Sequence, residues 1–382
     1  PTRPVTCGMD QVSCVLANGF AAMIDIPGLN YRTQRYKESY DQLPQNLILG
    51  SETASTVSSR GVYKFPVEEK KGAKYEDHQC SSYDVEACPW SNIPDEDFAL
   101  ADDNHWTIGQ FVWTGFDYLG EPTPYNKDLT NLLNFSDPNE LEKARKELEE
   151  LGKIKTPSRS SYFGIVDLCG FPKDRYYNYK SYWRPDVPTV HILPHWNWEE
   201  RIGEITPVHI YTSGDAVELF LNGKSLGRRE KAHSYDRLTW DDVRYEPGSL
   251  KAVAYKNGQK WAEELVETTG KPAALQVTAE KTELKSDGTD LSFIRVAVVD
   301  SQGRVVPRSK NHLKFSVTGP AEIIATDNGD ATSLLPFQLS ERDAYNGLAL
   351  VILRSQYMKQ GKVLLTVESK GLPKQKVVLK VE

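Results

Sequence analysis

Long apolar runs are missing from this sequence. No stretch approaches the roughly 20 apolar residues of a membrane-spanning helix, so we expect no membrane span. An excess of positive charge is missing too, because 46 Lys and Arg face 53 Asp and Glu, a net charge of −7. A surface of that sign does not attract phosphate backbones, which argues against nucleic acid as the main partner.

Cysteine is scarce, and its spacing does not suit a metal. The five cysteines contain no C-x-x-C pair, so we expect neither a zinc nor a redox site, no metal and no cofactor. Buried free thiols are the simplest expectation. A loop disulfide between Cys80 and Cys88 is the alternative.

Aromatic residues, by contrast, are plentiful. Eight Trp and 19 Tyr stand among many acidic residues. Aromatic faces cover the apolar faces of sugar rings, and carboxylates accept hydrogen bonds from hydroxyl groups. The composition therefore suits a carbohydrate partner.

The second half of the chain has a β texture. Apolar and polar residues alternate in short runs, two of which are followed by the hairpin signal Asn-Gly, at Asn222-Gly223 and Asn257-Gly258. The clearest strands are 208–211, 216–221, 250–255, 291–299, 313–317 and 363–367. A linker around 269–272 divides them, so we expect two immunoglobulin-like β-sandwiches, at 191–270 and 271–382.

Residues 1–190 have an α/β texture. Short apolar runs end at polar or aromatic residues, and continuous apolar runs favour a parallel sheet; they lie at 4–8, 21–26, 46–50 and 109–113. We expect a partial (β/α)₈ barrel of about strands 5–8, whose chemistry lies at the strand ends. A surface helix should begin after the N-cap Asp137 and end at Gly152.

Three strand ends carry candidate chemistry. Glu52 follows a buried strand among small residues, as a nucleophile at a sugar carbon requires, although an ordinary ion pair would also explain it. Tyr31 ends another strand, and a phenol can orient a carboxylate. Trp113 can form the floor of a sugar site, with Asp117 and Glu121 as hydrogen-bond acceptors for hydroxyl groups. Ordinary packing in the core and at its rim would also explain this aromatic run.

Taken together, these runs resemble the second half of the catalytic barrel of glycoside hydrolase family 2, and the resemblance covers essentially the whole chain. The matching runs are Asn30-Tyr31, Gly50-Ser-Glu-Thr-Ala-Ser55, Phe111-Val-Trp-Thr-Gly-Phe-Asp117 and Gly164 to Arg175. The resemblance implies that Glu52 is the catalytic nucleophile and that Tyr31 orients it. It implies that Trp113, Asn30, Asp117 and Glu121 bind substrate. It also implies a cis peptide bond after Trp113.

One element of the family pattern is not found. The general acid/base of the family is a Glu in an Asn-Glu pair at the end of the fourth barrel strand. The only Asn-Glu pair here, Asn139-Glu140, lies in the expected surface helix. We therefore expect the acid/base, the first half of the barrel and a sugar-binding domain to precede Pro1, in the missing N-terminal half of the same enzyme. The chain by itself should be inactive.

The resemblance also bears on the sugar. Glucuronidase-like members place an Asn and a Lys where Ser161 and Phe163 stand, so a neutral sugar is favoured. We expect a β-galactosidase-type exo-glycosidase that acts on a β-galactoside or related oligosaccharide, in a periplasmic or secreted location. The alternative is a non-catalytic carbohydrate-binding or adhesion protein built on the two sandwiches.

Overall fold

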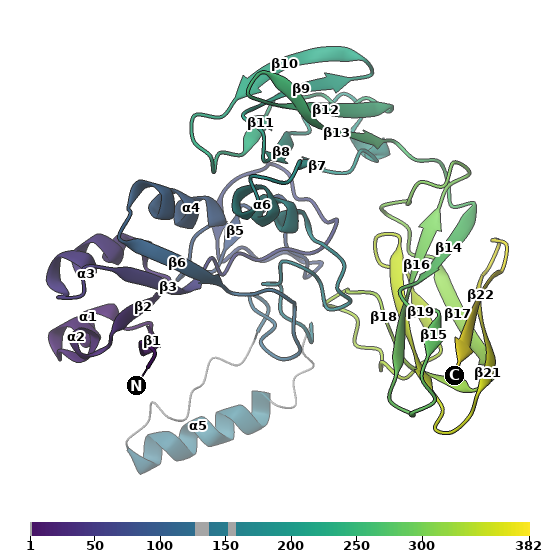
Figure 1. The fold of residues 1–382 in the computed structure, drawn as a ribbon, viewed down its shortest axis with the longest axis horizontal. Helices are drawn as coiled ribbons and strands as arrows, with labels where there is room; N and C mark the ends of the chain where they lie inside the picture. Colours follow the sequence, from purple (N-terminus) through teal and green to yellow (C-terminus); the bar gives the residue numbers. More distant parts are fainter. Residues whose placement is uncertain (1, 127–136, 152–157) are drawn as a thin grey trace.

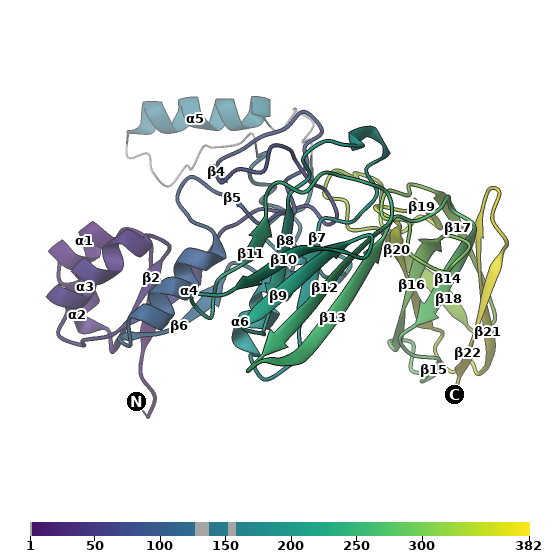
Figure 2. The same cartoon turned by 90° about the horizontal axis from the view of Figure 1, so that it is seen from above.

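A computed structural model of the chain describes residues 2–126, 137–151 and 158–382 (Figure 1). It contains an α/β part, a first sandwich of two antiparallel sheets packed on it, and a second, mainly antiparallel sandwich that includes the C-terminal strand (Figures 1 and 2). Within the described residues, no helix is both long and apolar enough to cross a membrane.

The α/β part is built on a four-stranded sheet in the order β1-β2-β3-β6, with every pair parallel. Its strands are β1 (Thr6–Met9), β2 (Ile26–Asn30), β3 (Ile48–Thr53) and β6 (Thr107–Val112). The helices of this part are α1 (Val12–Ala17), α2 (Phe20–Met23), η1 (Thr33–Arg35), α3 (Tyr36–Gln42) and α4 (Pro94–Asp103). Their apolar faces meet the sheet in a core that includes Met9, Val12, Leu29 and Ile48.

The strand predicted at 21–26 is wrong. Residues 20–23 form α2, and β2 begins only at Ile26. The Asn18 side chain accepts a hydrogen bond from the Phe20 amide at 2.9 Å, and Ala and Met favour a helix. Only Ala21 of this turn is buried, while Met23 is exposed.

Long loops and two further helices complete the α/β part. The loop after β3 carries the short strands β4 (Lys70–Lys71) and β5 (Glu86–Ala87). The predicted surface helix is confirmed as α5 (Pro138–Leu151), with the Asp137 carboxylate accepting the Asn139 amide at 2.6 Å. The predicted end at Gly152 lies outside the described residues. Helix α6 (Asp174–Trp183) leads into the first sandwich. Cys80 and Cys88 are both free and buried, so they form no disulfide, whereas Cys7 and Cys14 are free but exposed, and the expectation of buried thiols is wrong for those two.

The first sandwich packs sheet β10-β9-β12-β13 against sheet β11-β8-β7. Its elements are β7 (Val190–Leu193), η3 (Glu199–Arg201), β8 (Val208–Thr212), β9 (Ala216–Leu221), β10 (Lys224–Glu230), β11 (Leu238–Trp240), β12 (Ser249–Lys256) and β13 (Gln259–Glu267). The core between the sheets holds Trp196, Trp240 and Tyr245. Asn222 and Asn257 have positive φ, as do the glycines that follow them, which confirms both predicted hairpin turns.

The second sandwich packs sheet β14-β16-β20-β18 against sheet β15-β22-β21-β17-β19. Its strands are β14 (Ala274–Ala279), β15 (Glu283–Leu284), β16 (Leu291–Val299), β17 (His312–Thr318), β18 (Ala321–Asp327), β19 (Glu341–Asp343), β20 (Leu348–Ser355), β21 (Gly361–Ser369) and β22 (Gln375–Val381). Apolar side chains of both sheets interdigitate, and the predicted strands at 291–299, 313–317 and 363–367 are confirmed.

A histidine joins the α/β part to the first sandwich. His191 of β7 lies between two carboxylates, with Nε2 2.8 Å from Asp174 and Nδ1 3.4 Å from Glu264. Burial alone would lower the pKa of His191, but Glu264 and Asp174 outweigh burial and raise this pKa to about 9. The charged imidazolium therefore links α6 to β13.

This link makes stability depend on pH. The folded pKa of His191 exceeds its ordinary value of 6.5, so its contribution is complete below pH 6.5 and is lost as the pH rises through about 9. We expect His191→Gln to remove about 1–3 kcal/mol of this pH-dependent stability. Thermal unfolding between pH 6 and 10 should show a flatter profile for His191→Gln. The exposed His233→Gln is the control, and equal profiles for both variants would contradict this role of His191.

Candidate active site

The candidate site forms where β2 and β3 end side by side. The parallel register sets Asn30 opposite Glu52, with an irregularity after Leu29. Glu52 lies inside β3, whose end extends beyond the predicted strand. The backbone then turns through the left-handed region at Tyr31, Arg32 and Ala54, a conformation that is costly for residues other than glycine and that clusters at functional sites.

Tyr31 and Glu52 meet at this edge. The Tyr31 hydroxyl donates to the Glu52 carboxylate at 2.9 Å, as expected from the sequence, and the Tyr31 amide donates to the Glu52 carbonyl at 2.7 Å. Burial raises the pKa of Tyr31, and the Glu52 charge raises it further. The phenol therefore stays protonated and acts as a donor that holds one carboxylate oxygen in place.

A pocket of 330 Å³ opens beside this pair. Five residues predicted from the sequence line it: Asn30, Tyr31, Glu52, Trp113 and Glu121. Trp113 follows β6, its Nε1 donates to the Tyr118 hydroxyl at 3.1 Å, and Tyr118 in turn donates to Glu121. The Trp113–Thr114 peptide bond is cis, as expected. An aromatic wall thus faces a carboxylate, an arrangement that suits a sugar ring.

Four further residues line the pocket that sequence reasoning missed: Asp10, Arg32, Ser55 and Trp90. Trp90 is 36% exposed and adds a second aromatic surface. The Ser55 side chain is buried beside the Tyr31 hydroxyl. Arg32 pairs with Asp10 at 3.3 Å, so a cation does lie in the pocket, although it comes from a different segment than Ser161 and Phe163. No spacing signal marks these residues, because loops bring them together.

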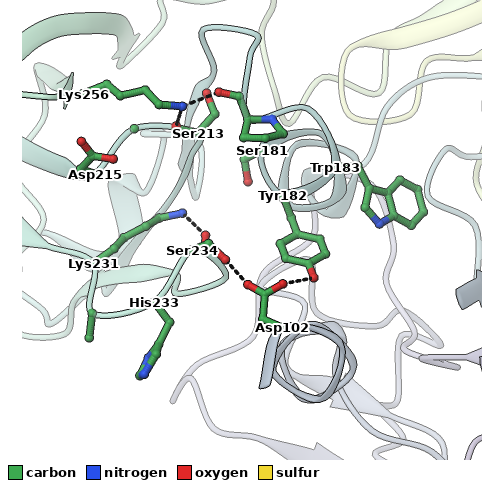
Figure 3. Close-up of a pocket in the computed structure, with 13 residues that line it drawn as sticks. Asp102, Ser181, Tyr182, Trp183, Ser213, Asp215, Lys231, His233, Ser234 and Lys256 are labelled. Carbon is green, nitrogen blue, oxygen red and sulfur yellow. Dashed lines mark hydrogen bonds between the residues drawn. The ribbon is translucent and has the colours of Figure 1, made fainter. Parts of the chain in front are cut away.

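A larger cavity of 730 Å³ lies between α4, α6 and the first sandwich (Figure 3). Its charged groups already have partners. Lys231 donates to the Ser234 carbonyl, and Asp102 accepts hydrogen bonds from Tyr182 and Ser234 (Figure 3). Lys231 also donates to the Thr212 carbonyl. These groups are therefore engaged in joining the elements around the cavity, and the smaller pocket at Glu52 is the better candidate site. The described residues contain no cluster of His, Cys, Asp or Glu that could hold a metal ion.

Comparison with known proteins indicates the family that this chain resembles. The family "Glycoside hydrolase family 2 C-terminal domain 5" matches residues 275–378, and a "Domain of unknown function (DUF4982)" matches residues 203–262. Beta-galactosidase BoGH2A of Bacteroides ovatus is 36% identical over the entire chain. This chain matches the C-terminal part of glycoside hydrolase family 2 enzymes.

Other relatives are also glycosidases, but their names do not point to one sugar. A putative beta-glucuronidase of Formosa agariphila is 31% identical over 60% of this chain, and the match covers 20% of that relative's own length. The crystal structure of a beta-glycosidase from Bacteroides vulgatus superposes on 99% of the chain with a TM-score of 0.76 and 25% identity. The chain spans 42% of the Bacteroides ovatus relative and 51% of the Bacteroides vulgatus chain.

Asp117 does not lie where the family 2 resemblance implied. It is buried outside the pocket lining, and its carboxylate pairs with Lys173 at 2.6 Å and accepts the Gly164 amide at 2.8 Å. Burial raises the pKa of Asp117 and lowers that of Lys173, while the attraction between them opposes both shifts. Asp117 therefore holds the segment behind Trp113, and its position does not support contact with substrate.

A single and a double variant test this structural role of Asp117. Asp117→Asn leaves the Lys173 ammonium buried without its counter-charge, so we expect a loss of about 3–5 kcal/mol in the free energy of unfolding. Adding Lys173→Met to Asp117→Asn removes the orphaned charge and should restore most of the loss. Denaturant unfolding measures both. A loss below about 1 kcal/mol in the single variant would contradict the buried pair.

Proposed function

We propose that this chain is part of a retaining exo-glycosidase of the β-galactosidase type, with Glu52 as its nucleophile. One observation carries the proposal: the Tyr31 hydroxyl holds the Glu52 carboxylate at 2.9 Å in a pocket walled by Trp113 and Trp90. A carboxylate held at a strand end, opposite an aromatic surface, suits attack on the anomeric carbon of a bound sugar.

In the first step, a Glu52 oxygen bonds to the anomeric carbon as the bond from that carbon to the leaving oxygen breaks. The leaving oxygen takes a proton from a general acid, and a covalent glycosyl-Glu52 ester remains. In the second step, the same group removes a proton from water, which displaces Glu52 and releases the sugar. Tyr31 keeps its proton throughout and orients Glu52.

We infer that the general acid comes from residues outside this chain. The other carboxylates of the pocket already have partners, because Asp10 pairs with Arg32 and Glu121 accepts from Tyr118. Within the described residues, the parallel sheet leaves β1 and β6 as edges, with Val5 next to β1 and Ile108 and Phe111 of β6 exposed, and Met23 of α2 is exposed as well. Further parallel strands that closed a (β/α)₈ barrel would cover these edges and supply an acid about 5–5.5 Å from Glu52.

The galactose assignment rests on the Bacteroides ovatus relative, which matches the entire chain and is named a beta-galactosidase. Ser161 and Phe163 are both buried and offer no cation to a sugar carboxylate. A β-glucuronide is the second candidate, because Arg32 lines the pocket and would be free to bind a carboxylate if it left Asp10. A non-catalytic carbohydrate-binding protein is the third, and the same assays test it.

The nucleophile is tested in the enzyme that contains this chain. Glu52→Gln should lower kcat at least about 10³-fold while leaving folding unchanged, because the attacking oxygen becomes neutral. A 2-fluoro-β-galactoside should form an ester on Glu52, detectable by mass spectrometry of the digested protein. Glu121→Gln is the control within the pocket, because it keeps Glu52 and should still form the ester on Glu52. A label on another carboxylate, or full turnover by Glu52→Gln, would make the assignment wrong.

An assay of the 382-residue chain alone tests whether the general acid lies within this chain. A missing general acid typically costs about 10²–10⁴-fold in rate when the leaving oxygen must be protonated, so the isolated chain should not measurably turn over a methyl β-galactoside, whose leaving group is an alkoxide. Turnover that disappears in Glu121→Gln would place the acid within this chain instead.

The sugar is tested by a pair of substrates. We expect kcat/KM for a nitrophenyl β-galactoside to exceed that for the β-glucuronide at least about tenfold, since Arg32, the one cation among the described residues that line the pocket, is paired with Asp10. Arg32→Gln should change the galactoside value little. If the glucuronide is preferred and Arg32→Gln abolishes that preference, the glucuronidase candidate replaces the galactosidase.

A further inference from the structure

The second sandwich contacts the segments that build the candidate site. Its loop 328–332, between β18 and β19, and its turn 345–346, before β20, lie against the α/β part, where the two parts adjoin in Figure 1. One segment that they contact is the loop that follows Glu52 and Ser55. The other is the segment 159–171, which pairs with the chain around Trp113. The sandwich thus contacts segments adjacent to those that carry Glu52 and Trp113, although it does not itself line the pocket.

Arg60 lies at the centre of this contact. Its Nε donates to Asp167 at 2.6 Å, and its Nη2 donates to the carbonyls of Asn328 and Tyr345, each at 2.9 Å. The Asn346 side chain returns a hydrogen bond to the Arg60 carbonyl at 2.7 Å. Arg60 and Asp167 are both buried, so this guanidinium connects three segments without competition from water.

A direct backbone path leads from this contact to Trp113. Next to Asp167, the amides of Ile165 and Val166 donate to the carbonyls of Thr114 and Gly115 at 2.9 and 3.0 Å. Ala331 of the sandwich packs in the same apolar cluster as Val57 and Trp113. The Arg159 amide donates to the Ala331 carbonyl at 3.0 Å, which fixes the sandwich loop beside this cluster.

The fit between the loop and Asp167 leaves no space. Gly329 has φ +78°, and a Cβ added there would lie 2.1 Å from the Asp167 carboxylate. Beside it, Gln79 donates to Asp330 and accepts from the Tyr345 hydroxyl, both at 2.9 Å. Because buried polar groups on both sides depend on this one arrangement, a shifted loop would leave several of them unpaired.

We propose that the second sandwich positions the candidate active site, with Arg60 as the positioning residue that fixes the loop after Glu52 and the segment paired with Trp113. Its part in catalysis rests on the proposed function. The mechanical coupling between the sandwich and the Trp113 segment does not. The sandwich is then a support for the sugar-binding wall rather than an independent module.

Hydrogen exchange on the intact chain tests the coupling without any substrate. Gly329→Ala should speed exchange of the Ile165 and Val166 amides about tenfold, because the displaced loop releases Asp167 and the backbone paired with it. Gly303→Ala is the matched control in the same sandwich: Gly303 has the same φ of +78°, but among the described residues no atom beyond its own chain neighbours lies within 4 Å of an added Cβ. Equal rates in the two variants would overturn the proposal.

Gly329→Ala could disturb the sandwich itself, and faster exchange at Val296 of β16 would reveal such a disturbance. A second variant tests the coupling in that case. Arg60→Lys lies outside the sandwich and keeps the charge beside Asp167, but an ammonium does not reproduce the guanidinium fork to two carbonyls. It should still speed exchange at Ile165 and Val166 while Val296 stays protected. Unchanged exchange at Ile165 and Val166 would overturn the role of Arg60.

Kinetics of the enzyme that contains this chain then separate positioning from chemistry. Arg60→Lys should raise KM about tenfold and change kcat less than about threefold, whereas Glu52→Gln removes kcat. A fall in kcat with unchanged KM would overturn positioning of the sugar wall. If no glycoside is turned over by the unsubstituted enzyme, the proposed function fails, while the exchange rates still decide the coupling.

Discussion

The parallel pairing of β2 with β3 is the constraint on which the candidate site depends. Parallel strands end at the same edge of a sheet, so Tyr31 and Glu52 meet although a helix and two loops separate them in sequence. The close approach needs Gly28, where an added Cβ would lie 2.6 Å from the Cys7 carbonyl and 2.9 Å from the Ser51 hydroxyl. A side chain at this position would push the strands apart and separate the two residues.

Buried charges hold the surrounding segments in one arrangement. Arg175 pairs with Asp84 at 2.8 Å, Lys173 with Asp117 and Arg60 with Asp167, and in each pair both side chains are nearly inaccessible. Such pairs contribute little net stability, because desolvation offsets the attraction between the charges. They do penalise any rearrangement that separates them. These charge pairs and the apolar cluster that contains Val57 and Phe163 together define the loops behind the pocket.

Much of this fold could be predicted from local patterns. The sandwich strands and hairpin turns follow from alternation and from Asn-Gly pairs, and β9 and β16 have the predicted bounds. The error at 21–26 arose because a short apolar run does not distinguish a helical turn from a buried strand. The error at Asp117 arose because a carboxylate that follows a strand has the same sequence pattern whether its side chain faces a pocket or pairs with a buried lysine, here Lys173.

The sequence by itself determined which side chains stand at strand ends, and five of its six candidate site residues line one pocket. The tertiary structure alone brought Asp10, Arg32 and Trp90 to that pocket and turned Asp117 away from it. It alone set loop 328–332 against Arg60 and Asp167. The physical reason is range: backbone periodicity and turn chemistry are properties of neighbouring residues, whereas these contacts join segments that only the packing of whole sheets brings together.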